Sequence, residues 1–151
     1  MENEKDTSFK LSGFWPYALN QAAEALSLGF QSVYRKKYAM TRTEWRVLAH
    51  LGEFGRLSAK DICERASLHK TKVSRAVVAL EDKRWLERST NEKDRRAEYL
   101  ILTKAGVQAY HDLTKEADTL NMQLVDGISA TELATFKKVL NALSKNSNQP
   151  H

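Results

Sequence analysis

The chain has 151 residues, 42% of them hydrophobic, which is enough to bury one core and too short for two ordinary domains. No apolar run approaches the roughly 20 residues of a membrane-spanning helix, and the polar first residues do not resemble a secretion signal. The single cysteine, Cys63, excludes an intrachain disulfide and a thiolate zinc cage. We therefore expect a cytoplasmic protein with one domain and helical extensions.

The net charge of +5 is concentrated in one part of the chain. Residues 69–96 hold nine basic and five acidic side chains, a balance of +4, so the remainder of the chain sums to +1. Such an excess is either an ordinary solvated face or the footprint of a nucleic-acid-binding surface. The charge by itself leaves both explanations open.

Apolar stripes predict long helices near both ends of the chain. The first helix is expected over about 15–35, with Pro16 in its opening turn and a stripe formed by Leu19, Ala22, Ala23, Leu26, Phe30 and Val33. Two later stripes consist of Tyr110, Leu113, Ala117, Leu120 and Leu124, and of Leu133, Phe136, Leu140 and Leu143. Each stripe can be ordinary core or a packing seam, but three are hard to bury in one short monomer. We therefore expect a homodimer built from these helices.

Three segments have the pattern of a capping box, in which a hydroxyl and an acidic side chain three residues later satisfy amides of the first helical turn. They are Thr41–Glu44, Ser58–Asp61 and Ser129–Glu132. Each is flanked by an apolar staple pair: Met40 with Trp45, Leu57 with Ile62, and Ile128 with Leu133. We expect a helix to begin at each of these points.

The segment 41–104 has the pattern of a helix-turn-helix followed by a pair of strands. A short helix is expected from Ser58 to about Arg65, and the next helix begins near Leu68 or His69. The apolar spacing of the second helix predicts a buried face formed by Val73, Ala76, Val77 and Leu80. Its opposite face mixes hydroxyls with long cations, which suits base edges and phosphates. The predicted DNA-contacting residues are His69, Lys70, Thr71, Lys72, Ser74 and Arg75.

Two strands, Trp85–Ser89 and Ala97–Leu102, are predicted directly after this helix by their aromatic and branched residues. The charged, turn-prone segment between them would make a hairpin with a basic tip. A hairpin after a recognition helix is the wing of a winged helix, and a tip arginine can enter the minor groove. The predicted wing residues are Lys93, Asp94, Arg95 and Arg96. Because the basic excess lies on both elements, we favour DNA binding over a solvated face.

Over about residues 12–145 the chain resembles the MarR family of transcriptional regulators. The motifs that carry the resemblance are Asp94-Arg-Arg96, Leu102-Thr103-Lys-Ala-Gly106, Lys72-Val-Ser-Arg75 and Leu80-Glu81. The resemblance implies a homodimer with two winged lobes on a pseudo-palindromic operator. It also implies that Arg96 enters the minor groove and that Asp94 orients an arginine of the wing.

One position departs from the family pattern. The family commonly has Gly just after the recognition helix, where this chain has Lys83-Arg84-Trp85. If Arg84 occupies a left-handed position there, it costs about 1 kcal/mol relative to Gly.

The expected fold is mainly α, a winged helix-turn-helix of the α+β kind with about six helices and a two-stranded wing. We expect a flexible N-terminus at 1–11 and a flexible C-terminus at 146–151. The helical dimerisation region would comprise 12–40 and 105–145, and the winged helix-turn-helix DNA-binding region 41–104.

Enzymatic functions find no support in the residue inventory. The six glycines form neither a phosphate loop nor a dinucleotide fingerprint, and no nucleophile motif is present. The four histidines lack a pair at metal-ligand spacing. We therefore expect no catalytic residues, no cofactor and no metal site.

The family resemblance implies an effector pocket between the dimer helices and the winged lobe, often accepting aromatic acids. A cation near aromatic walls can hold an aryl carboxylate or a phenol by charge-assisted hydrogen bonds and stacking. The candidate residues are Phe14, Trp15, Tyr17, Arg46 and His50. Each can equally be explained as dimer core or as an ordinary surface contact.

The resulting interpretation is a dimeric repressor that an aromatic acid releases from an inverted-repeat DNA operator. Two alternatives stay open: a redox sensor working through Cys63, and a winged helix used only for protein interaction. Cys63 is expected on the short helix as a small buried hydrophobe, and Asp61 and Glu64 disfavour its thiolate whereas Arg65 favours it. Thiol-dependent DNA release would favour the sensor, and absence of salt-sensitive duplex binding would favour the interaction module.

Overall fold

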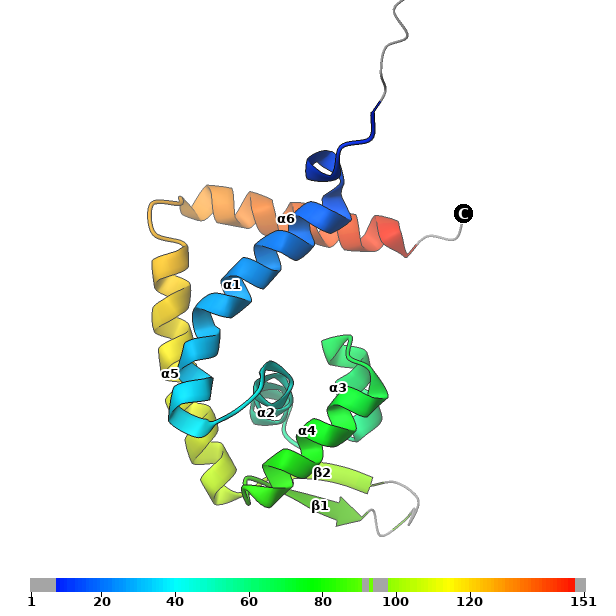
Figure 1. Cartoon of the computed structure of the whole chain (residues 1–151), viewed down its shortest axis with the longest axis vertical. Helices are drawn as coiled ribbons and strands as arrows, with labels where there is room; N and C mark the ends of the chain where they lie inside the picture. Colours follow the sequence, from blue (N-terminus) through cyan, green and yellow to red (C-terminus); the bar gives the residue numbers. More distant parts are fainter. Residues whose placement is uncertain (1–7, 91–92, 94–97, 149–151) are drawn as a thin grey trace, which may run out of the picture. The chain divides into compact units, whose positions relative to one another are not determined.

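The computed structural model describes residues 8–90, 93 and 98–148, and these fall into two compact units that divide between Glu116 and Ala117. Figure 1 shows the order of the elements: η1 Leu11–Gly13, α1 Trp15–Tyr38, α2 Arg42–Phe54, α3 Ala59–Ala66, α4 Lys70–Asp82, β1 Leu86–Thr90, β2 Glu98–Leu102, α5 Lys104–Leu124 and α6 Ala130–Ser147. Six α-helices and one antiparallel pair of strands in this part of the chain confirm the expected fold class. Most of the predicted flexible ends, 1–7 and 149–151, lie outside the described residues.

All three predicted capping boxes are present. The hydroxyls of Thr41, Ser58 and Ser129 each accept a hydrogen bond from the amide three residues later, and the acidic side chain there accepts one from the cap amide. The Ser58 amide and hydroxyl hold the pKa of the Asp61 carboxyl below its usual value. The helix starts are therefore satisfied locally, as the sequence predicts.

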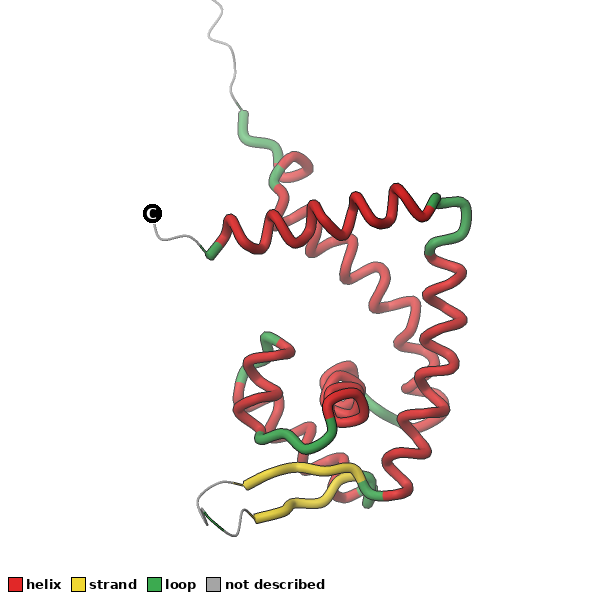
Figure 2. Tube along the Cα trace, turned by 180° about the vertical axis from the view of Figure 1, so that it is seen from behind, coloured by secondary structure: helices red, strands yellow, loops and turns green. Residues whose placement is uncertain are grey.

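The core of the first unit lies among α2, α3, α4 and the hairpin. In Figure 2 the two yellow strands run beneath the red helices of this unit. The fully buried side chains are Tyr34, Met40, Val47, Leu48, Ile62, Val73, Leu80, Leu86, Leu100 and Leu113. The four residues predicted to form the inner face of the recognition helix are all buried.

The second half of α1 packs onto this core through aromatic rings. The ring centroids of Phe30 and Trp45 lie 5.1 Å apart, and Tyr34 stacks on Trp45 at 6.3 Å. The helix continues to Tyr38, three residues beyond the expected end, and stops at Ala39 in a left-handed conformation. Aromatic rings packed edge-to-face or offset-stacked stabilise a contact beyond the burial of their surface. These ring contacts therefore fix the C-terminal end of α1 to α2.

The hairpin has a third partner that the sequence analysis missed. β1 and β2 pair with Leu86 opposite Leu102 and Thr90 opposite Glu98, and β1 begins and ends one residue later than expected. Ala97, the expected first residue of the second strand, lies outside the described residues. Leu57, in the turn between α2 and α3, exchanges two backbone hydrogen bonds with Leu100 of β2 at 2.8 and 3.2 Å. A two-stranded hairpin is marginally stable alone, so this bridge anchors the middle of β2 to the helix-turn-helix.

Arg84 does occupy the left-handed position in which the MarR family commonly has Gly, with φ of +62°. The amide of Trp85 donates to the Leu80 carbonyl at 3.0 Å, and the Arg84 amide donates to the Glu81 carbonyl at 2.9 Å. This pair of bonds is the Schellman ending of a helix. The Thr103 hydroxyl donates to the Arg84 carbonyl at 2.7 Å, which helps to hold a backbone geometry that glycine would adopt more cheaply.

The second unit consists of the end of α5 and α6. α6 has no buried residue, and Phe136 and Val139 on it are 56% and 48% exposed. The described residues of the second unit therefore leave its apolar stripe exposed. None of the described helices is long and apolar enough to cross a membrane.

Candidate nucleic-acid interface

The predicted recognition helix, α4, has its apolar residues on a buried face and its predicted DNA-contacting residues on an exposed face. Its inner face is buried, whereas the five predicted polar residues are all exposed: Lys70, Thr71, Lys72, Ser74 and Arg75. His69 precedes the helix as its N-cap, and its Nδ1 accepts a hydrogen bond from the Thr71 amide at 3.3 Å. The structure thus gathers the predicted set on one exposed side of α4, with His69 serving the helix start.

The short helix α3 is held in place by α2. The Arg46 guanidinium donates to the Ala66 carbonyl, at the last residue of α3, at 2.5 Å. Ser67 then takes a left-handed conformation, with φ of +51°, and the chain turns into α4. Arg46 was predicted as an effector-binding cation, but here it satisfies a helix-end carbonyl and fixes the angle of the helix-turn-helix.

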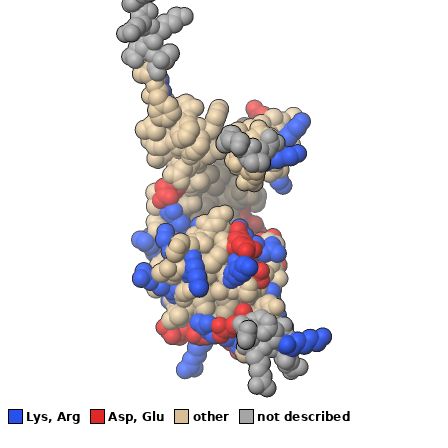
Figure 3. Space-filling model, turned by 90° about the vertical axis from the view of Figure 1, so that its right-hand side faces the viewer, with Lys and Arg blue, Asp and Glu red and all other residues tan. Residues whose placement is uncertain are grey.

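Lys72 and Arg75 border a shallow hollow between α4 and the start of α2. The hollow is lined by Thr41, Thr43, Glu44, Lys72, Arg75, Ala76 and Ala79. No hydrogen bond or ion pair links Lys72 or Arg75 to another described residue. Figure 3 shows one face of the molecule, on which Lys and Arg side chains form separate groups with acidic groups between them. The two cations are therefore available to an external anion.

Val78 is a surface residue of α4 that the sequence analysis did not single out. It is 47% exposed and lies one helical turn after Ser74, although its residue type is typical of a core. The sequence did contain a signal for this exposure: Val78 is seven residues after Thr71 and four after Ser74, and such spacings place residues on the same face of a helix. An exposed methyl pair on such a face can contact the methyl group of thymine.

The described part of the hairpin contains a charged cluster on the side of α4. Arg88 Nε donates to Glu81 Oε2 at 2.9 Å, and its Nη1 donates to Glu98 Oε2 at 3.1 Å. The Glu81 carboxylate, followed by that of Glu98, raises the pKa of the Arg88 guanidinium. Lys93 is exposed, whereas the predicted wing residues Asp94, Arg95 and Arg96 lie outside the described residues.

The predicted effector residues are not joined into one site. Phe14, Trp15 and Tyr17 are 45%, 64% and 39% exposed. His50 Nδ1 lies 2.6 Å from the Arg46 carbonyl, which can only accept, so Nδ1 carries the proton. Within the described residues, no hydrogen bond or ring contact connects the three aromatic side chains with Arg46 or His50.

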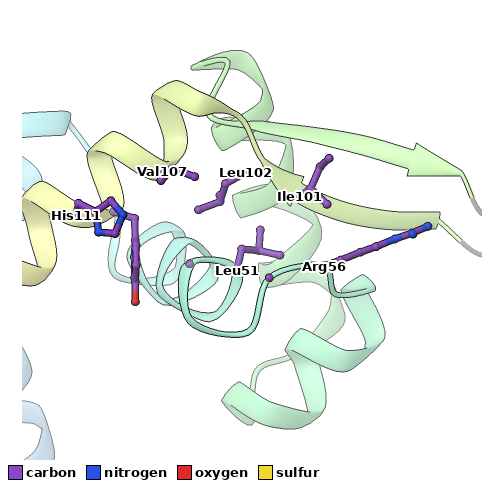
Figure 4. Close-up of a pocket in the computed structure, with 9 residues that line it drawn as sticks. Leu51, Arg56, Ile101, Leu102, Val107 and His111 are labelled. Carbon is purple, nitrogen blue, oxygen red and sulfur yellow. The ribbon is translucent and has the colours of Figure 1, made fainter.

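A second hollow, the α2–α5 hollow, lies between the end of α2, β2 and the start of α5 (Figure 4). It encloses about 250 Å³ and is lined by Leu51, Gly52, Gly55, Arg56, Ile101, Leu102, Val107, Tyr110 and His111. Tyr110 lies so close to Gly52 that a Cβ there would overlap its ring. Figure 4 shows aliphatic side chains in the middle of the hollow, with Arg56 and His111 at opposite ends. The guanidinium of Arg56 stacks on the Tyr99 ring, 4.3 Å from its centroid.

Two further features bear on the alternatives. Cys63 is a free thiol and half-buried on α3. Among the described residues, no group of three or more His, Cys, Asp or Glu side chains could hold a metal ion.

Comparison with known proteins places this geometry among transcriptional regulators. The model of the MarR family matches residues 40–97, which span α2, α3, α4 and β1. The HTH-type transcriptional regulator FarR of Neisseria gonorrhoeae is 26% identical over 127 residues, covering 84% of this chain and 86% of the relative. The crystal structure of a MarR/EmrR family transcriptional regulator from Acinetobacter sp. ADP1 matches with a TM-score of 0.85 and 25% identity, covering 94% of this chain and 100% of that one.

A third similar protein is BpsR of Bordetella bronchiseptica, whose structure concerns the regulation of its DNA binding by 6-hydroxynicotinic acid. It matches with a TM-score of 0.78 and 20% identity, covering 95% of this chain and 99% of that one. At this identity the likeness is one of fold.

Proposed function

Because this chain belongs to the MarR family of transcriptional regulators, we propose that it is a homodimeric repressor that an aromatic acid releases from an inverted-repeat operator. The observation that carries the DNA-binding part is the exposed face of α4. There, cations and hydroxyls lie outward over a fully apolar inner face. A helix of this kind fits the major groove, where it can reach both base edges and phosphates.

The chemistry of each side chain indicates which part of the DNA it can contact. Lys72 and Arg75 can bond to guanine acceptors or phosphates, and Thr71, Ser74 and Val78 can meet bases through hydroxyl or methyl groups. The hairpin, anchored at its base, would place Lys93, Asp94, Arg95 and Arg96 beside the adjacent minor groove, with Asp94 orienting an arginine. Residues 41–104 would then be the DNA-binding region.

Exposed apolar side chains support a homodimer. The first half of α1 and the segment before it expose Phe9, Leu11, Phe14, Trp15, Tyr17, Leu26 and Leu28, and the later helices expose Met122, Leu124, Phe136 and Val139. Large exposed apolar side chains of this kind, present in each of the two units, are typical of an interaction surface. We propose that 12–40 and 105–145 supply it and that its occupant is a second copy of the chain, which would bring two recognition helices to one operator.

The DNA-binding proposal is tested by titrating the purified chain with duplexes selected from a random-sequence pool. We expect specific binding whose affinity falls steeply as salt rises, because lysine and arginine side chains displace counterions from phosphates. Binding should survive a thiol reductant. Absence of salt-sensitive duplex binding would overturn the proposal in favour of a protein-interaction module.

We place the effector in the α2–α5 hollow rather than at Arg46. Its aliphatic middle suits one aromatic ring, and Arg56 and His111 at its ends can attract a carboxylate or a phenol. Its walls come from α2 and β2 of the winged lobe and from α5 of the proposed dimer region. The likeness to BpsR supports the class of ligand, because 6-hydroxynicotinic acid is a single-ring aromatic acid.

In the wild-type protein, we expect 6-hydroxynicotinic acid or a hydroxybenzoate to raise the dissociation constant for the operator. An effector shifts an equilibrium only by its differential affinity, so variants that block the hollow should lose this response. His111→Ala removes one polar end, and Val107→Phe fills the space from an exposed position. Both should bind the operator normally without ligand, as measured by fluorescence anisotropy.

The matched control is His50→Ala, which removes the imidazole of the other candidate site. A response that persists in both hollow variants and disappears in His50→Ala would assign the effector to the Phe14, Trp15, Tyr17, Arg46 and His50 set. If no aryl acid acts on the wild type but peroxide releases the DNA and Cys63→Ser prevents this, the redox alternative takes its place.

A further inference from the structure

The Arg88 side chain connects the outer half of the hairpin with the recognition helix. Its guanidinium uses two different nitrogen atoms: Nε bonds to Glu81 in the last turns of α4, and Nη1 bonds to Glu98 at the start of β2. Three elements, α4, β1 and β2, therefore meet at one planar group. The rigid fork of arginine suits this task, whereas a lysine ammonium would impose no such plane.

The strand register shows what this contact controls. Arg88 lies opposite Leu100, and Glu98 lies opposite Thr90, the last residue of β1. The Arg88 side chain thus crosses the hairpin diagonally toward the end that leads to the wing tip. Buried Leu86 and Leu100 fix the hairpin from its base to its middle pair, but the residues beyond that pair are not buried. The angle of the outer half relative to α4 then depends on polar contacts.

The cluster contributes little to global stability. The side chains of Arg88, Glu81 and Glu98 are 38%, 39% and 48% exposed, and ion pairs this exposed are largely offset by solvent and by lost side-chain entropy. The cluster can still strengthen DNA binding. If it fixes the orientation of the hairpin before binding, the complex does not lose the conformational entropy of ordering the hairpin.

We propose that Arg88, held between Glu81 and Glu98, is a positioning residue that sets the angle between the wing and the recognition helix for DNA binding. This inference rests on the proposed DNA-binding function. Arg88 itself need not contact DNA. Its effect passes through the orientation of the hairpin.

Neutralising the two carboxylates tests the proposal, because the DNA affinity should rise or fall according to their role. Glu81 and Glu98 place two negative charges beside a surface that meets a polyanion, so if Coulomb repulsion alone acted, neutralising them should tighten binding. If they instead hold Arg88 in its productive place, their removal should weaken binding. The two mechanisms therefore predict opposite changes for one variant.

The test is the full-length double variant Glu81→Gln and Glu98→Gln, titrated with the operator selected by the wild type at one fixed salt concentration. We expect an affinity loss of about 3- to 10-fold, the scale of one or two orienting contacts. The matched control is Asp82→Asn with Glu87→Gln, which neutralises two exposed acids on α4 and β1. Neither of those acids has a hydrogen bond or ion pair to a described residue. The control should bind as well as the wild type or more tightly.

A second measurement separates positioning from loss of fold. In an Arg96→Ala background, where the predicted wing contact is already absent, the Glu81 and Glu98 substitutions should lose most of their effect on affinity. Circular dichroism and urea unfolding should show little change in any of these variants. Unchanged or tighter binding by the Glu81 and Glu98 variant overturns the proposal, as does an equal loss in the Arg96→Ala background.

Failure of this inference is distinguishable from failure of the proposed function. If the wild type binds no duplex, DNA binding itself is wrong. If the wild type binds and Lys72→Ala weakens it, while the Glu81 and Glu98 variant binds normally, only the role of Arg88 is wrong.

Discussion

Replacing Lys72 and Arg75 together by Ala is expected to remove most specific operator binding. Each contact to a base edge or phosphate contributes about 1–3 kcal/mol, which is about 5- to 150-fold in affinity per residue. Both side chains are exposed on α4, and no hydrogen bond or ion pair joins either of them to another described residue, so their removal leaves no buried group unsatisfied. The fold should therefore persist while the affinity falls.

The measurement is a duplex titration of the double variant at several salt concentrations. A control with the same loss of charge is Lys138→Ala with Lys145→Ala, two exposed lysines of α6, outside the proposed DNA surface. The control should retain most of the affinity, because neither lysine belongs to the face of α4 or to the hairpin. Equal losses in both variants would mean that net charge, rather than the face of α4, carries the binding.

Gly106→Ala should be the most damaging substitution for the fold. A Cβ at this position would overlap the backbone carbonyl of Trp85, and backbone cannot move aside as a flexible side chain can. The Gly106 amide also donates to the Thr103 hydroxyl, which in turn bonds to Arg84, so a shift here disturbs the junction of α4, the hairpin and α5. We expect a loss of about 2–3 kcal/mol in the free energy of unfolding.

Urea unfolding followed by circular dichroism measures this change. The matched control is Gly29→Ala in α1, where a Cβ meets nothing within 4 Å. Alanine is the better helix former by about 1 kcal/mol, so this control should be more stable than the wild type. A Gly106→Ala protein as stable as the wild type would show that the close packing against Trp85 is not required.

Local features of the fold could be predicted from the sequence because they depend on neighbours along the chain. The capping residues Thr41, Ser58 and Ser129 mark helix starts, and the spacing of Val73, Ala76 and Leu80 identifies the inner face of α4. These signals are read over a few residues and need no knowledge of the tertiary structure. A left-handed Arg84 was considered only because the MarR family, which the chain resembles, commonly has Gly at this position.

Contacts between distant segments could not be predicted in this way. The bridge of Leu57 to Leu100 joins backbone groups, and the Arg46 guanidinium donates to the backbone carbonyl of Ala66. Every residue carries such backbone groups, so the residue types do not mark these partners. The acids that hold Arg88 are 7 and 10 residues away, and in the sequence they look like ordinary surface charges. The close approach of Tyr110 to Gly52 likewise depends on how α5 packs on α2.

The central claim is that two copies of this chain act together on one operator. The most direct measurement is the mass, by sedimentation, of the complex that the chain forms with its selected duplex. We predict free protein at about twice 17.2 kDa and two chains on each duplex, which carries an inverted repeat with half-site centres about 10–11 base pairs apart. A monomer that binds a single half-site as tightly as the full repeat, one chain to each duplex, would contradict the claim.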